Sequence, residues 1–162
     1  MKKPRYRLQP VLEVREQAKK EAAQRLAAAR QALAEAEAEL ARRLAAVDAC
    51  RQRQAEANAK LAAALQAGSA AHVLLAHRTF LTALKEEEQR LQEAVEQQRA
   101  VIQQSEAAVE TALQGLIEAS KEVQAIEKHK ENWQLSRKLE AERRENKAND
   151  EFGTARHGRR AE

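Results

Sequence analysis

The stretch from Leu81 to Trp133 most constrains the fold, because it carries an apolar stripe that advances in alternating steps of three and four residues. Such a stripe keeps one narrow face of a helix against a partner, which is the pattern of a coiled-coil seam. The stripe has a few polar positions that weaken it locally and can set register, namely Glu88, Gln98, Ser105 and Lys130. The sequence therefore predicts one long coiled-coil helix, whose seam a second helix must cover.

Composition supports an all-helical chain without a globular core. Charged residues make up 33% of the 162 residues and aromatic residues only 2%, and there are 4 glycines and 2 prolines. Alanine and leucine with Glu, Gln, Lys and Arg are strong helix formers, and heptad spacing in such a composition indicates coiled coil. Too few large apolar side chains are available to enclose a catalytic pocket. We expect an elongated, all-α unit.

A thinner Leu/Ala seam precedes this stripe. It runs in steps of four and three from Ala22 to Leu40 and continues at Leu44 and Val47. Two consecutive steps of four shift the phase, as a stutter would. The sequence then predicts polar seam positions at Arg51, Gln54 and Asn58, which would make this the loosest part of the first helix.

The helix breaks at Gly68, the only glycine before position 115. A glycine after a long periodic segment marks a helix C-terminus, and Ser69 is a candidate N-cap for the next helix. Two helices joined by so short a connection lie antiparallel. With the connection near Ser69, mirror counting places Val11 beside about residue 127, so that the second helix overhangs the first by about 20 residues.

The expected organisation is thus a single antiparallel two-helix coiled-coil hairpin. It comprises a basic lead-in (1–10), a first helix (11–67), a turn (68–71), a second helix (72–150) and a flexible basic tail (151–162). Pro10 suits the first turn of the first helix, where its missing N–H is not needed.

Charge is concentrated at the ends of the chain. Residues 1–30 and 128–162 together hold 19 Lys/Arg and 10 Asp/Glu, whereas residues 31–127 hold 10 and 15. A hairpin brings both basic ends together, so we expect one positively charged end. A single cysteine, Cys50, fits a reducing compartment, and no apolar run reaches the length of a membrane span or forms a signal peptide.

Motifs of catalysis and cofactor binding are missing from the sequence. It holds no glycine-rich phosphate loop, no cysteine pair and no His-Glu-x-x-His, and His72 and His77 near the turn do not have convincing ligand spacing. The run of glutamates at 86–88 is interpreted as an exposed helix face. We therefore expect no enzymatic activity, no cofactor and no metal.

Three interpretations of the basic end are open. It can be merely a solvated helix end, a nucleic-acid surface, or a docking surface for a protein. Aromatic residues do not interleave with its cations, and nearby acids would repel phosphates, namely Glu140, Glu142, Glu145, Asp150 and Glu151. Mixed charge with a few apolar anchors suits a protein partner better.

Both ends of the chain resemble a known family. Residues 6–16 (YRLQPVLEVRE) are similar to the start of the flagellar export protein FliJ and its type III secretion counterparts of the YscO group. Residues 145–152 (ENKANDEF) are similar to that family's charged C-terminal motif. The resemblance implies a cytoplasmic stalk, peripheral at the inner membrane, with a two-helix coiled coil like the central shaft of the rotary ATP synthase. The end with both termini would enter the hexameric export ATPase and promote its assembly and activity.

The resemblance, with the charge argument, implies a set of ATPase-binding residues: Arg5, Arg7, Leu8, Leu12, Arg15, Leu139, Arg143, Arg144, Lys147, Asp150, Glu151 and Phe152. It also implies contact with the cytoplasmic domain of the export-gate membrane protein through Phe80 and Leu84, and contacts with substrate chaperones. Tyrosines that the family can carry on the facing helix are replaced here by Ala49 and Arg53. The opening residues favour a flagellar over an injectisome system.

We therefore expect a monomeric, non-catalytic stalk of a type III export apparatus, without nucleic acid as partner and without membrane insertion. The alternative is a generic scaffold coiled coil that self-associates through an unpaired seam and has no ATPase partner. A third possibility is a binder of nucleic acid or anionic membranes through the basic ends.

Overall fold

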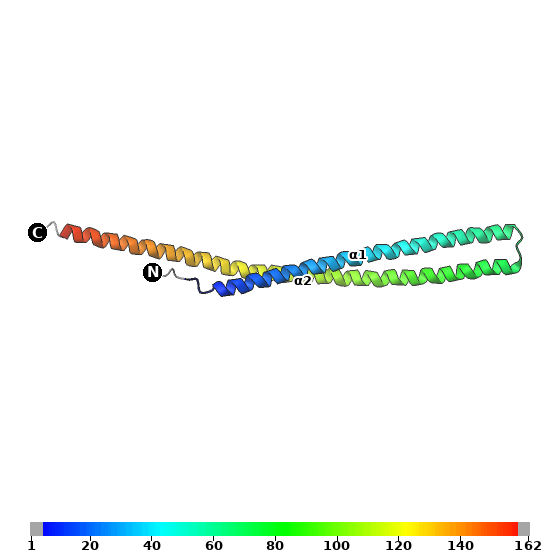
Figure 1. Ribbon diagram of the computed structural model, residues 1–162, viewed down its shortest axis with the longest axis horizontal. Coiled ribbons are helices and arrows are strands. Elements are labelled where there is room, and N and C mark those ends of the chain that lie inside the picture. The colour runs from blue at the N-terminus through cyan, green and yellow to red at the C-terminus, as the bar shows by residue number, and fades with distance from the viewer. Residues whose placement is uncertain (1–4, 159–162) are drawn as a thin grey trace. The chain divides into compact units, whose positions relative to one another are not determined.

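The protein is an all-α helical hairpin of two long helices that pack against each other (Figure 1). The computed structural model describes the backbone of residues 5–158 and the side chains of residues 5–149. Helix α1 spans Gln9–Gln66 and helix α2 spans Ala71–Gly158. The first helix thus begins two residues earlier than predicted, with Pro10 in its first turn, where a missing N–H costs no hydrogen bond.

The helices are connected at Gly68, where the sequence predicted the break. Gly68 has a φ of 66°, a left-handed conformation that glycine adopts without steric cost. Its N–H donates to the carbonyl of Leu65 (3.2 Å), and the N–H of Ser69 donates to the carbonyl of Ala64 (3.0 Å). This pair of bonds is the Schellman motif, which satisfies the last carbonyls of α1. The first turn of α2 starts from the carbonyl of Ala70, so Ala70 rather than Ser69 occupies the N-cap position.

The predicted seam of α2 is confirmed along its whole length. Every position of the stripe from Leu81 to Trp133 is buried or half-buried, including the polar ones. The side chain of Gln98 is 6% exposed, and its Nε2 donates to the backbone carbonyl of Ala36 at 2.9 Å. Helix α1 of the same chain therefore fills the seam, and the polar positions are satisfied across it.

The chain divides into two structural units, each of which contains one stretch of α1 and one stretch of α2. The first comprises Met1–Gln24 with Gln114–Glu162, and the second comprises Arg25–Leu113 with the connection. In the second unit, the predicted stutter of α1 is wrong. The seam keeps its four-three steps through Arg43, Val47, Cys50, Gln54 and Ala57, all of them buried or half-buried.

The predicted phase shift of the α1 seam was wrong because Arg43, and not Leu44, occupies the seam position. Leu44 is the apolar neighbour, but it is 41% exposed, while the stem of Arg43 lies in the seam. The Arg43 guanidinium donates from Nη1 to the carbonyl of Ala94 (2.7 Å) and from Nε to Glu39 (3.0 Å). A long side chain can bury its methylene stem and still carry its charge to polar partners, so arginine is a valid seam residue.

The stretch expected to be loose is instead a packed cluster. Cys50 is fully buried and packs with Ala57, Leu81 and Leu84. The Cys50 thiol donates to the carbonyl of Leu84 at 3.4 Å. Small side chains on α1 opposite leucines on α2 let the helices approach closely, which is how two helices without large aromatic residues form a core.

In the first unit, Leu12 and Ala22 of α1 are buried, as is Val123 of α2. The pairing register agrees with mirror counting, because Arg15 contacts Glu122 and Gln9 contacts Lys130. Helix α2 continues beyond this pairing as the overhang that was predicted (Figure 1).

The end of α2 lies further along the chain than predicted. We expected a flexible tail from residue 151, but the backbone is helical through Gly158. Proline is absent from this stretch, and one interior glycine costs only about 1 kcal/mol relative to alanine. Within the described residues, no helix is long and apolar enough to cross a bilayer.

Candidate functional site

The start of α1 is fixed to α2 by the chain's single tyrosine. Tyr6 is 8% exposed, and its hydroxyl lies 2.8 Å from Nδ1 of His129 and 3.4 Å from the carbonyl oxygen of Ile126. Its ring centroid lies 5.4 Å from that of Trp133 and 5.8 Å from that of His129, in tilted arrangements. Such offset aromatic contacts are favourable beyond their buried area. Residues 5–8 are therefore held against α2 through the contacts of Tyr6.

Arginines surround this aromatic cluster. Arg5 and Arg7 flank Tyr6 in the chain, and Arg137 lies one helical turn after Trp133. Together with the rings and Leu8, they line a half-open cavity of about 510 Å³. Arg5, Arg7 and Leu8 were predicted from the sequence as binding residues, whereas the aromatic residues and Arg137 were not. The sequence offered one signal for Tyr6 and Trp133, which is that the chain has only one Tyr and one Trp.

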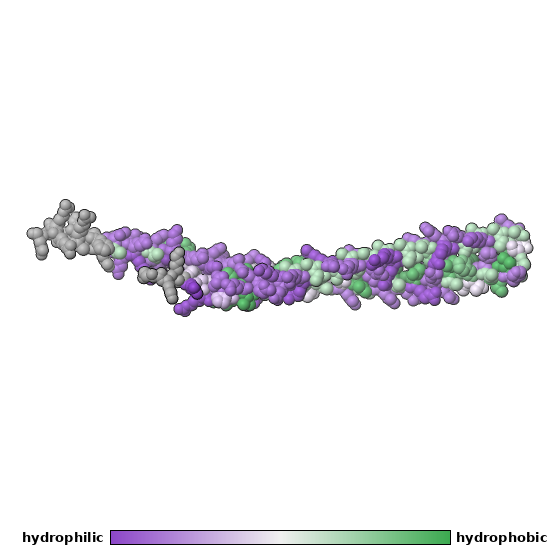
Figure 2. All heavy atoms as spheres, viewed as in Figure 1, coloured by the Kyte–Doolittle hydropathy of each residue, from purple (hydrophilic) through white to green (hydrophobic). Residues whose placement is uncertain are grey.

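Beyond this cluster, α2 extends without a facing helix segment among the described residues. All side chains from Lys138 to Asn149 are exposed. The seam positions that follow Trp133 are charged, being occupied by Arg137, Glu140, Arg144 and Lys147, whereas Leu139 is 46% exposed on another face. Figure 2 shows this change in character, since the surface is largely hydrophilic over the C-terminal stretch of α2 and more hydrophobic towards the connection.

The structure places the predicted ATPase-binding residues in three settings. Leu12 is 4% exposed and packs the helix pair, and Arg15 pairs with Glu122 at 2.6 Å while both remain about half exposed. Leu8 is 37% exposed beside the cavity. A further group lies exposed on the overhang, namely Leu139, Arg143, Arg144 and Lys147. Asp150, Glu151 and Phe152 fall on helical backbone, but their side chains lie outside the described residues.

The two predicted gate-contact residues lie in different environments. Phe80 is 53% exposed, in a shallow groove with Leu75, Ala76 and Thr79. Leu84 is 2% exposed and belongs to the cluster around Cys50. Leu84 is a seam position of α2 and packs against α1, whereas Phe80 precedes the seam position Leu81 and points outward. Contact of the export gate with Leu84 stays a prediction, and it would require the helix pair to open there.

The part of α1 that faces α2 just after Phe80 carries polar side chains. Arg53 Nη2 pairs with Glu87 at 2.5 Å, and Arg51 Nε pairs with Glu88 at 2.8 Å. Hydrogen bonds from Arg51 and Gln54 hold the pKa of Glu88 below its usual range, and the same pairing raises the pKa of Arg51. These ion pairs tie α1 to α2.

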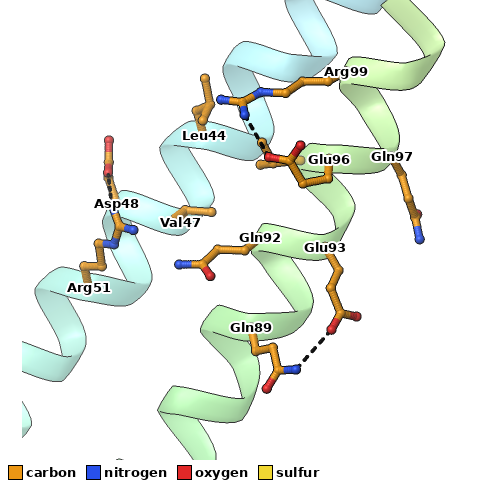
Figure 3. A pocket seen from close by; sticks show the side chains of 11 residues that line it. Leu44, Val47, Asp48, Arg51, Gln89, Gln92, Glu93, Glu96, Gln97 and Arg99 are labelled. Atoms are coloured by element: carbon orange, nitrogen blue, oxygen red, sulfur yellow. Dashed lines mark hydrogen bonds and ion pairs between the residues drawn. The ribbon is translucent and has the colours of Figure 1, made fainter.

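A larger groove of about 720 Å³ lies further along the same pair of helices (Figure 3). Leu44 and Val47 of α1 border it, but the α2 side is mainly Gln and Glu. Its charged side chains are paired locally, with Arg99 on Glu96 at 2.8 Å and Gln89 on Glu93 at 3.2 Å. Within the described residues, no three His, Cys, Asp or Glu side chains gather as a metal site.

The comparisons with known proteins agree with this architecture. A family model described as YscO-like protein matches residues 3–162. The chain is also similar to the solved structure of CT670 from Chlamydia trachomatis, which is described as a YscO homolog. The two share 23% identity with a TM-score of 0.80, over 96% of each chain. A search of curated proteins found no match.

Proposed function

Because this chain belongs to the YscO-like family, whose members are components of type III secretion, we propose that it is the non-catalytic stalk of such an export machine. In this proposal the end that carries the start of α1 and the overhang of α2 docks in the hexameric export ATPase and promotes its assembly and activity. The observation that carries the proposal is the overhang itself, an exposed helix whose seam positions become charged and mostly basic beyond the start of α1.

The charge of the overhang supports a protein partner. Residues 134–149 hold five basic and three acidic side chains, all in exposed or half-exposed positions. Basic side chains interspersed with acids and with two exposed leucines, Leu135 and Leu139, match a partner surface of mixed polarity. Charged seam positions also disfavour self-association, because a second copy would bring like charges together.

The covered seam supports the stalk over the alternative of a self-associating scaffold. That alternative required an apolar seam without a partner, and α1 fills that seam from Leu81 to Trp133. We therefore propose a monomer, located at the cytoplasmic face of the inner membrane where the export ATPase works. The family match supports a secretion machine, and assignment to a flagellum remains a prediction.

Contact with the export gate is proposed for the surface around Phe80. Leu75 and Phe80 are the large exposed apolar side chains there, being 65% and 53% exposed. The same stretch of α2 is the proposed site for substrate chaperones. Leu84 supports this surface from within, through its contacts with Cys50.

A turnover assay of the cognate export ATPase tests the docking proposal. We expect wild type to stimulate ATP hydrolysis, and a variant truncated after Lys138 to lose that stimulation while it keeps its helical melting transition. The truncation leaves the contacts of Tyr6 and Gln9 with α2 in place, so the hairpin should fold.

Point variants sharpen this test. Arg143→Gln with Arg144→Gln removes two exposed cations from the overhang, and Arg25→Gln with Arg30→Gln removes two exposed cations from α1 as the matched control. The proposal fails if wild type does not stimulate the ATPase, or if both double variants behave alike.

A further inference from the structure

We propose that the cavity around Tyr6 and Trp133 captures a carboxylate side chain from an acidic, partly apolar segment of the export ATPase. This inference rests on the proposed function for the identity of the partner, but the cavity itself is defined by this chain alone. Three arginines line it, Arg5, Arg7 and Arg137, and no acidic residue does among those that the structure describes.

The floor of the cavity is preorganised. The Tyr6 side chain is held by its contacts with His129 and the Ile126 carbonyl, and its ring lies against that of Trp133. These rings need no rearrangement to receive a ligand, so less conformational entropy is lost on binding. Tyrosine, tryptophan and arginine are also the residues that most often dominate the energetics of protein interfaces.

The walls of the cavity suit a carboxylate. Arginine presents a planar fork of N–H donors that matches the two oxygens of a carboxylate. Arg137 uses one Nη1 donor on Glu140 at 2.9 Å, and both side chains stay partly exposed, at 40% and 50%. Arg5, Arg7 and Arg137 all line the same space of about 510 Å³, and no acidic side chain is among the described residues that line it.

A protein segment fits this cavity better than a nucleic acid does. Leu8 and the faces of Tyr6 and Trp133 give it an apolar part that a phosphate backbone would not use. Glu140 and Glu131 lie exposed on the adjacent α2 surface, where they would repel a chain of phosphates but tolerate an isolated carboxylate. The occupant is therefore an acidic side chain flanked by apolar residues.

Trp133 is the only tryptophan of the chain, so its fluorescence reports on the cavity. The probe is a capped hexapeptide of alternating Glu and Leu, with the Gln–Leu hexapeptide and sodium phosphate as comparisons. We expect the Glu–Leu peptide alone to cause a saturable change in emission of the wild-type chain. The double variant Arg5→Gln with Arg7→Gln should bind it at least about tenfold more weakly, since two charge-assisted contacts are lost. The control Arg25→Gln with Arg30→Gln should bind as wild type does.

Absence of a Trp133 response to the Glu–Leu peptide would overturn the inference, and so would an equal response to phosphate or to the Gln–Leu peptide. The ATPase provides the second arm, in which affinity of the hexamer for wild type and for both double variants is measured. Binding that weakens about tenfold only in the Arg5/Arg7 variant supports the inference. Equal binding of all three chains overturns it but leaves the docking proposal standing. If wild type does not bind the ATPase, the proposed function fails, whatever the peptide arm shows.

Discussion

Leu84 and Phe80 lie four residues apart on α2, and the structure assigns them opposite roles. Leu84 is 2% exposed within the cluster of Cys50, Ala57 and Leu81, whereas Phe80 is 53% exposed. We predict that Leu84→Ala destabilises the hairpin and that Phe80→Ala does not. Any loss of partner binding in Leu84→Ala would then follow from loss of packing.

The expected magnitude follows from burial. Truncation of a buried leucine to alanine costs about 2–5 kcal/mol, and a seam between only two helices can relax, so we expect about 2–3 kcal/mol for Leu84→Ala. At about 2–4 °C per kcal/mol for a chain of this size, the melting temperature should fall by roughly 4–12 °C. Phe80→Ala exchanges an exposed aromatic residue for the best helix former, so its effect should stay within about 0.5 kcal/mol.

Cys50 gives a local measurement of the same effect. It is the chain's only cysteine, it is fully buried, and its thiol donates to the carbonyl of Leu84. A thiol reagent can therefore reach Cys50 only when the helices open locally. If opening becomes easier by about 2–3 kcal/mol, the modification rate in Leu84→Ala should rise roughly 30- to 140-fold. Circular dichroism melts and thiol modification would be measured on wild type and both variants.

Phe80→Ala serves as the control, and its Cys50 should react at the wild-type rate. The reasoning would be refuted if the two variants shifted the melting temperature alike, or if Cys50 reacted equally fast in both. Either result would mean that Leu84 does not seal the cluster.

Three further predictions concern other parts of the hairpin. Gly115→Ala should raise stability by about 1 kcal/mol in a urea melt, because a Cβ there meets open space and alanine is the better helix former; a loss of stability would show that this position needs the glycine. Tyr6→Phe should cost about 0.5–1.5 kcal/mol and alter Trp133 emission, since the hydroxyl loses its partners on α2; an unchanged melt and spectrum would contradict this anchoring. Because the pKa of Glu88 is lowered in the folded state, its stabilising contribution is present above the usual glutamate pKa of 4.5 and is lost as pH falls through the lower folded-state value. The melting temperature of Glu88→Gln should therefore fall less between pH 5 and pH 3 than that of wild type.

The buried seam positions of α2 could be predicted from the sequence residue by residue. A heptad stripe is a property of consecutive residues on one helix, so the positions from Leu81 to Trp133 could be read without knowledge of the partner. The turn was equally local, because Gly68 alone can take the left-handed conformation without strain. From these two features the hairpin, its register and its overhang followed.

The candidate site was only partly predictable. Exposed cations such as Arg143 could be named from composition, because long charged side chains stay at the surface unless paired. The cluster of Tyr6 with His129 joins residues 123 positions apart, and no local pattern links them. The burial of Leu84 could not be inferred from the resemblance, because the resemblance matches residue identity by position, whereas exposure depends on the facing helix.

The amino-acid sequence by itself determined that the chain forms two long helices, where it turns back, and which stripe of α2 is buried, since each depends on spacing within one segment. Tertiary structure alone decided that Arg43 rather than Leu44 enters the α1 seam, because the Ala94 carbonyl that receives its guanidinium belongs to the other helix. It also decided that arginines and aromatic rings from both ends of the chain enclose one cavity. Contacts of this kind depend on which groups face each other across the helix pair, and spacing within a single helix does not contain that information.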